Sequence, residues 1–148
     1  MTNHPNIMNI VVADDDMDDQ MLMKKAFQKG TKHVNFVFVE NGLELMNYLE
    51  REGKYNDDKM YPEPDLILLD LNMPKKDGRE VLAELKKSHE FCKIPVVVFT
   101  TSESYDDLIF SYTKGGNSYI VKPTSFDDLI KVGTELENYW HKTVSLPR

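Results

Sequence analysis

Five short runs of apolar, largely β-branched residues recur along the chain, and a stretch with helical periodicity follows each of them. The runs cover residues 7–13, 35–39, 66–70, 94–100 and 118–122. Most are continuously apolar, which is typical of strands buried on both faces of a sheet. Strict alternation of strands and helices implies right-handed crossovers and a parallel sheet. The sequence therefore predicts an α/β fold, a doubly wound five-stranded parallel sheet with five helices.

The stretches between the runs carry apolar residues on one helical face. One helix is expected to begin near Gly42, and the faces of the others are formed by Leu22, Met23, Ala26 and Phe27, by Val81, Leu82 and Leu85, by Leu108, Ile109 and Tyr112, and by Phe126, Leu129, Ile130 and Val132. The segment 51–65 is polar and contains two prolines, which predicts a long loop. It serves either as a solvated connector or as a loop that binds a partner.

Length and charge restrict the classes of function. The chain has 148 residues, enough for one domain (residues 1–148), and no second domain is expected after the last helix. A net charge of −7 argues against direct binding of nucleic acid, which requires a basic face. The N-terminus lacks the pattern of a signal peptide, and apolar runs of about five residues are too short to cross a bilayer. A single cysteine, Cys92, suits a reducing compartment, so we expect a cytoplasmic protein.

Carboxylates gather where the first and third strands end. Asp70 closes the run 66–70, and Asp14, Asp15 and Asp16 follow the first run. The ends of parallel strands meet at one edge of the sheet, where such folds place their sites. N-capping of the next helix explains Asp16, whereas Asp14 and Asp15 would repel Asp70 unless a proton or a cation compensates them.

A divalent cation fits these carboxylates better as Mg²⁺ than as Ca²⁺. Counted from Asp14, a calcium loop of the EF-hand type requires glycine at its sixth position and glutamate at its twelfth. The chain has Asp19 and Lys25 there, which excludes that motif. Two or three hard oxygen ligands suit Mg²⁺, which keeps several waters and also binds phosphate.

The fourth and fifth strands end in a hydroxyl and an ammonium group. Thr100 closes the fourth strand and Lys122 the fifth. Together with Mg²⁺ they supply what the oxygens of a phosphoryl group need during its transfer. The carboxylate of Asp70 would then be the nucleophile, and the product would be an aspartyl phosphate.

The motifs "VVADDD", "LILLDLNMPKKDG", "VVVFTTS" and "SYIVKP" resemble the receiver domain of two-component response regulators over residues 7–140. The resemblance implies the flavodoxin-like fold of receivers, with Asp70 as the phosphoacceptor. It implies that Asp15 and Asp70 bind Mg²⁺ directly, that Asp14 acts on the metal through water, and that Asn72 contributes its backbone carbonyl.

The resemblance also implies roles at the other strand ends. Thr100 and Lys122 would each bond a phosphoryl oxygen, and the peptide bond between Lys122 and Pro123 would be cis. Tyr119 matches the aromatic residue that turns inward when Thr100 moves, although it could also be a packed strand residue. Asn72 and Ser102 would line the path of the water that removes the phosphoryl group.

More narrowly, the polar loop before the third strand and the end "YWHKTVSLP" resemble the single-domain receivers paired with bacterial phytochromes. This implies a sensor histidine kinase as phosphoryl donor, with a bacterial phytochrome as one candidate, and it allows homodimers. The protein would catalyse its own phosphorylation and dephosphorylation and would not act on a separate metabolite.

Two alternatives remain. A receiver-shaped binding module that works without phosphorylation would be expected to lack the acidic pair, the lysine or the acceptor, and all of these are present here. A phosphohydrolase with an aspartate nucleophile typically carries a second aspartate two residues later, where this chain has Asn72.

Overall fold

Five parallel strands form the centre of the structure, a computed structural model that describes residues 7–148. They lie side by side in the order β2-β1-β3-β4-β5. The register pairs Ala13 of β1 with Leu69 of β3, and Thr100 of β4 with Val121 of β5. The predicted doubly wound parallel sheet is confirmed, with strands β1 (Met8–Ala13), β2 (Val34–Val39), β3 (Leu66–Leu69), β4 (Val96–Thr100) and β5 (Ser118–Val121).

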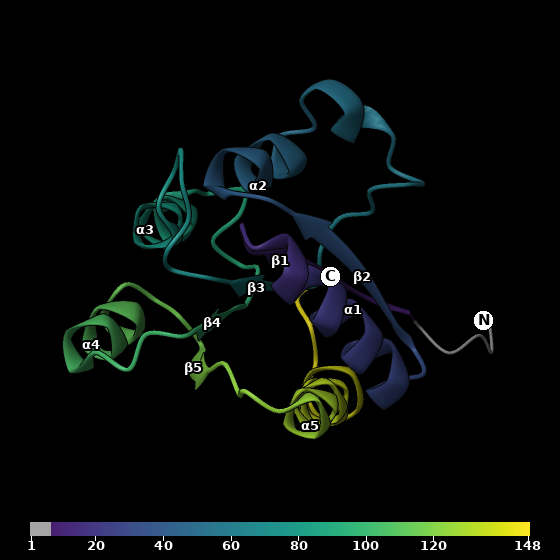
Figure 1. Cartoon of the computed structure of the whole chain (residues 1–148). Helices are drawn as coiled ribbons and strands as arrows, with labels where there is room; N and C mark the ends of the chain where they lie inside the picture. The colour runs from purple at the N-terminus through teal and green to yellow at the C-terminus, as the bar shows by residue number, and fades with distance from the viewer. Residues whose placement is uncertain (1–6) are drawn as a thin grey trace.

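Helices cover both faces of this sheet. The helices α1 and α5 pack against each other on one face, and α2, α3 and α4 lie on the other (Figure 1). Within residues 7–148, no helix is both long and apolar enough to cross a membrane. The bounds are α1 (Met17–Gly30), α2 (Gly42–Leu49), α3 (Gly78–Lys87), α4 (Tyr105–Thr113) and α5 (Phe126–Leu136), with a 3₁₀ turn η1 (Gly53–Asn56) after α2 and a π-helical segment η2 (Glu137–Thr143) that continues α5.

The core consists of two apolar layers, one on each side of the sheet. In the strand β1, Ile10 and Val12 face the layer that contains Phe27 of α1, whereas Val11 and Ala13 face the layer of α2 and α3. Nearly all residues of the three central strands are buried, as their continuous apolar runs predict. The edge strands β2 and β5 are only partly buried.

Polar residues cap the helices that follow the strand ends. The side chains of Asp16, Asn41, Ser104 and Ser125 each accept a hydrogen bond from the backbone N–H three residues later. Such caps satisfy N–H groups that the first helical turn leaves unpaired. The chain therefore turns sharply from strand to helix, and the last residue of each strand stays at one edge of the sheet.

The segment 51–65, predicted to be a loop, contains the short helix η1. The ring of Tyr55 is buried there and lies 5.2 Å from the ring of Tyr48 and 4.9 Å from that of Tyr61, measured between centroids. Aromatic pairs at such distances are stabilising. The composition of the segment is polar, but these aromatic contacts order it.

The apolar faces predicted for three helices are only partly correct, and in α5 the side chain of Phe126 is 37% exposed. In α4 the side chains of Ile109 and Tyr112 are 46% and 50% exposed, and the buried residue of this helix is Ser111. The helix packs beside the edge strand β5, so the sheet covers only part of its surface. In α1, Leu22 is 48% exposed, while the other three predicted residues are buried.

Candidate functional site

Three carboxylates meet at the ends of β1 and β3. Asp14 follows β1 and Asp70 follows β3, and both are buried, whereas the neighbouring Asp15 is exposed. The backbone N–H of Asp70 donates to Ala13 at 3.0 Å, which fixes the two strand ends side by side. Asp14, Asp15 and Asp70 each offer an oxygen, and these oxygens lie within 4.8 Å of one another. The prediction that these strand ends share one edge is confirmed.

The ammonium group of Lys122 lies among these carboxylates. It donates to Asp70 at 3.1 Å and to Asp19 at 3.4 Å, and it also forms a short hydrogen bond with Asp14. Only 9% of the Lys122 side chain is exposed. Burial lowers the pKa of Lys122, but its hydrogen bond with Asp14 and the charges of Asp14 and Asp70 outweigh that effect and hold the pKa above its ordinary value.

Hydrogen bonds fix both the side chain and the backbone of Asp14. One carboxylate oxygen of Asp14 accepts a hydrogen bond from the backbone N–H of Asp16 at 2.9 Å. The backbone carbonyl of Asp14 accepts one from the side-chain amide of Gln20 at 2.6 Å. Burial raises the pKa of Asp14 above its ordinary value, against the opposing effect of Lys122. The carboxylate is therefore fixed in position and has little access to water.

The chain comes very close to Asp70 again where α3 begins. A Cβ atom at Gly78 would lie 2.0 Å from the carbonyl oxygen of Asp70. The N–H of Gly78 donates to Leu71 at 2.9 Å, which closes the loop after the strand. Only glycine fits this approach, which explains why a glycine follows Asp70 at this distance along the chain.

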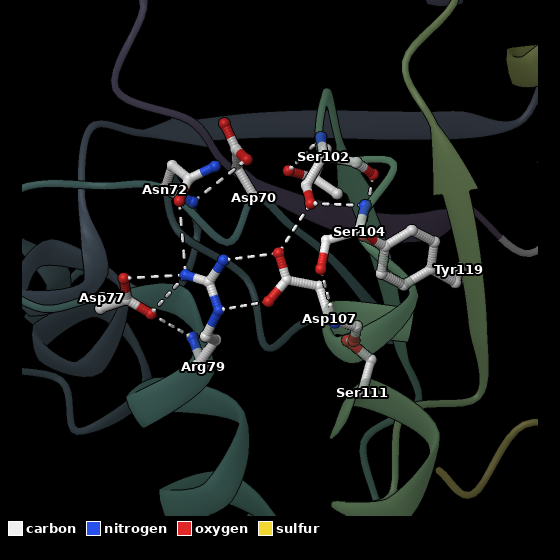
Figure 2. A network of polar contacts seen from close by, with 10 residues as sticks. Asp70, Asn72, Asp77, Arg79, Ser102, Ser104, Asp107, Ser111 and Tyr119 are labelled. Atoms are coloured by element: carbon white, nitrogen blue, oxygen red, sulfur yellow. Dashed lines mark hydrogen bonds and ion pairs between the residues drawn. The ribbon is translucent and has the colours of Figure 1, made fainter. Parts of the chain in front are cut away.

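The end of β4 carries Thr100, which is completely buried. Its hydroxyl oxygen accepts the N–H of Ser102 at a long distance of 3.4 Å. The hydroxyl of Tyr119, on the neighbouring strand β5, donates to the carbonyl of Ser102 at 2.9 Å, and its ring packs against the core (Figure 2). Tyr119 therefore points inward and is tied to the segment that follows Thr100.

The peptide bond between Lys122 and Pro123 is trans, because none of the peptide bonds within residues 7–148 is cis. The cis bond implied by the resemblance is therefore wrong for this structure. Trans is the ordinarily preferred isomer of such a bond. The trans bond still allows the Lys122 side chain to reach the carboxylates.

An ion pair that was not predicted from the sequence lies beside the site. Arg79 of α3 donates to the two carboxylate oxygens of Asp107 of α4 at 2.8 and 2.7 Å, and Ser102 donates to the same carboxylate at 2.6 Å (Figure 2). Arg79 also lies 3.3 Å from the side-chain oxygen of Asn72. One signal was available, because an arginine in the first turn of a helix opposes the helix dipole and calls for an acidic partner.

The site offers three carboxylates, a buried ammonium, a hydroxyl and backbone groups at one edge of a parallel sheet. Hard oxygen donors of this number fit a small divalent cation that keeps several of its waters. An ammonium beside a carboxylate nucleophile stabilises negative charge that develops on a transferred group. The arrangement can therefore hold a metal ion and accept a phosphoryl group.

Comparisons with known proteins identify the family and support the fold. Residues 10–133 match the family described as "Response regulator receiver domain". The chain is 40% identical to the response regulator Rcp1 of Synechocystis sp. over 146 residues, which is 99% of this chain and 96% of Rcp1. The described fold resembles the crystal structure of Mn²⁺-bound Rcp1 with a TM-score of 0.83, covering 95% of this chain and 99% of that one.

Two further solved structures are similar. The phosphorylated cyanobacterial phytochrome response regulator RcpA is 41% identical, with a TM-score of 0.86 and coverage of 96% of this chain and 99% of that one. The bacteriophytochrome response regulator AtBRR is 33% identical, with a TM-score of 0.73 and coverage of 97% and 100%. On the extent of these matches, the chain belongs to the family of response regulator receiver domains.

Proposed function

We propose that this response regulator receiver domain accepts a phosphoryl group from a sensor histidine kinase on the carboxylate of Asp70. The observation that carries the proposal is the buried ammonium group of Lys122, which lies 3.1 Å from the carboxylate of Asp70. Two more carboxylates, those of Asp14 and Asp15, lie at the same edge of the sheet. A lysine with a purely structural role would require one acidic partner, and gathering three carboxylates around it adds repulsion between them. The similarity to phosphorylated RcpA supports the same reaction.

In this reaction an oxygen of Asp70 attacks the phosphorus atom of a phosphohistidine. A P–O bond to Asp70 forms as the P–N bond to the donor breaks, and the donor imidazole keeps the electron pair. Lys122 offsets charge on a phosphoryl oxygen, and the hydroxyl of Thr100 binds another. Attack of water on the phosphorus atom later reverses the modification by breaking the P–O bond.

The carboxylates of Asp14, Asp15 and Asp70 fit the metal ion, and we propose Mg²⁺, with the carbonyl of Asn72 as a further ligand. When bound, Mg²⁺ neutralises phosphoryl charge. Asp70 and Asp15 would contact the ion directly. Asp14 would act through water, because its carboxylate already bonds Lys122 and the backbone of Asp16.

The signal is proposed to leave through Thr100 and Tyr119. Movement of Thr100 toward a phosphoryl group would shift the segment that follows it. In that segment the carbonyl of Ser102 accepts a hydrogen bond from the Tyr119 hydroxyl. The surface around α4, β5 and α5 exposes Tyr105, Ile109, Tyr112, Val121 and Phe126. We propose that this face docks a second copy of the chain or the kinase, and that phosphorylation shifts that equilibrium by about 1–3 kcal/mol.

The donor kinase is proposed to be of the bacterial phytochrome type, because RcpA and AtBRR are named as phytochrome response regulators. A cytoplasmic location is proposed as well. The free Cys92 is exposed, and a reducing compartment keeps such a thiol reduced.

The decisive experiment is incubation with Mg²⁺ and acetyl phosphate followed by intact-protein mass spectrometry. The wild type is expected to gain one adduct of about 80 Da, the mass of a phosphoryl group. The variant Asp70→Asn should gain none, and the control Asp58→Asn, at an exposed aspartate of the loop after α2, should behave as the wild type. An adduct on Asp70→Asn at the wild-type rate would show that the phosphoacceptor is another residue.

A further inference from the structure

The side chains of Asn72 and Ser102 flank the proposed phosphorylation site, and one guanidinium group holds both. Asn72 lies two residues after Asp70, and Ser102 lies two residues after Thr100. Arg79 contacts the side-chain oxygen of Asn72 directly, at 3.3 Å. It reaches Ser102 through Asp107, whose carboxylate accepts two hydrogen bonds from Arg79 and one from the Ser102 hydroxyl (Figure 2).

These contacts form a clasp between the first turns of two helices, the Arg79–Asp107 clasp. The fork of Arg79 matches the carboxylate of Asp107 with both N–H groups, at 2.8 and 2.7 Å, which fixes the orientation as well as the distance. Asp77 adds a third acidic contact to Arg79 at 3.1 Å. The hydrogen bonds from Arg79 and then from Ser102 hold the pKa of Asp107 below its ordinary value, so the carboxylate stays charged at neutral pH.

The ion pair of the clasp is partly buried. The side chain of Asp107 is 16% exposed and that of Arg79 is 30% exposed, so solvent screens the pair less than it screens a surface pair. The backbone N–H of Ser104 donates to the Ser102 hydroxyl at 3.2 Å, and the Tyr119 hydroxyl donates to the Ser102 carbonyl at 2.9 Å. Ser102 is therefore held through its side chain and its backbone together.

We propose that Arg79 is a positioning residue that lengthens the life of the phosphoryl group on Asp70. Water would remove the group by in-line attack on phosphorus from the side opposite the Asp70 oxygen, which breaks the P–O bond and releases inorganic phosphate. The side chains of Asn72 and Ser102 lie on either side of Asp70 (Figure 2) and would border that path, and the clasp ties the two together. Releasing them gives water a wider path, so the P–O bond breaks faster. This inference rests on the proposed function.

The test measures the first-order loss of the phosphoryl group after the donor is removed, by intact mass. We expect Arg79→Gln and Asp107→Asn each to speed the loss by about three- to tenfold, the range that one hydrogen bond supports. The double variant should lose the group no faster than Arg79→Gln. Arg79→Lys should resemble Arg79→Gln, because an ammonium keeps the charge but not the fork.

A matched control and a second background separate positioning from general stability. Lys76→Gln removes a positive charge from the loop just before α3, where Lys76 pairs with Glu84 at 2.5 Å, and should leave the rate of loss unchanged. In protein that already carries Asn72→Ala and Ser102→Ala, Arg79→Gln should have no further effect, since the residues through which it acts are gone. A merely structural role would still show there.

Each outcome decides the inference. If the wild type gains a phosphoryl group but the variants lose it at an unchanged or slower rate, the clasp does not protect it and only this inference fails. The same holds if Arg79→Gln acts equally in both backgrounds. If the wild type gains no phosphoryl group, the proposed function fails as well. If Arg79→Gln does not fold, the rate at which Asp107→Asn loses the phosphoryl group decides the inference in its place.

Discussion

The ammonium group of Lys122 lies between two buried carboxylates, so its replacement by an apolar side chain of similar length tests the electrostatics of the site. In Lys122→Met, Asp14 and Asp70 lose their shared cation, although their side chains are only 2% and 9% exposed. Removing one partner of a buried ion pair costs about 3–5 kcal/mol. Asp19 adds little to this, because its side chain is 41% exposed.

The assay is urea unfolding at neutral pH without added metal. The expected loss corresponds to a midpoint lower by about 2 M urea, and to a melting temperature lower by about 10 °C. Lys131→Met is the matched control: Lys131 pairs with Asp128 at 3.8 Å and its side chain is 78% exposed. It should change the free energy of unfolding by no more than about 0.5 kcal/mol.

The pH dependence of the loss has a definite sign. Burial raises the pKa of Asp14 above 3.8, and Lys122 opposes that rise. Without Lys122 the pKa rises further, so the folded variant takes up a proton at a pH where the unfolded chain is still charged. The deficit relative to the wild type should therefore shrink as pH falls from neutral toward 3.8. In the wild type Lys122 stays charged throughout this range, so its own titration does not change the free energy of unfolding with pH.

Added Mg²⁺ should also reduce the deficit, because a ligand that binds only the folded state stabilises it. Two results would refute the reasoning. One is a loss below about 1 kcal/mol at neutral pH, which would place the pair among weak surface pairs. The other is a loss of the expected size that does not change on acidification, which would mean that apolar packing and not charge had been disturbed.

Two further predictions concern residues with different exposure. Asp15→Asn should weaken Mg²⁺ binding by at least about tenfold in titration calorimetry, because few charged ligands are present, while unfolding without metal should change little because Asp15 is exposed. Glu137→Gln should lower the free energy of unfolding by about 1–3 kcal/mol, since this buried carboxylate accepts the backbone N–H groups of Lys32 and His33. Burial raises the pKa of Glu137 but those N–H groups outweigh it and lower the pKa, so the contribution is present above pH 4.5 and should disappear below it as the carboxylate is protonated, as urea unfolding across that range can show.

The sequence predicted the cluster at the strand ends because a single geometric rule controls it. Parallel strands end at a common edge, so the positions of Asp14, Asp70 and Lys122 at the ends of three runs were enough to bring them together. Gly78 could be noticed but not explained, because its role depends on a backbone approach of 2.0 Å that only coordinates show.

The parts that sequence reasoning missed depend on how separate elements meet. The contact between Arg79 and Asp107 joins two helices far apart in the chain, and helical periodicity says nothing about which helix ends lie side by side. Burial of Tyr55 depends likewise on two other tyrosines of the same region. In α4, periodicity identified an apolar face but could not show that the helix packs beside the edge of the sheet, where that face is left uncovered.

The exposed apolar face of α4 and the clasp at its N-terminus have a common consequence. Among the residues of this helix only Ser111 is buried, so little apolar packing resists its displacement. Its first turn is held by polar contacts, which are directional and can be exchanged for others without opening a cavity. A helix held in this way can move when the segment around Ser102 moves, and the surface that moves with it is the one that carries Ile109 and Tyr112. We therefore expect the contacts that border the proposed phosphorylation site to influence the position of the surface proposed to bind a partner.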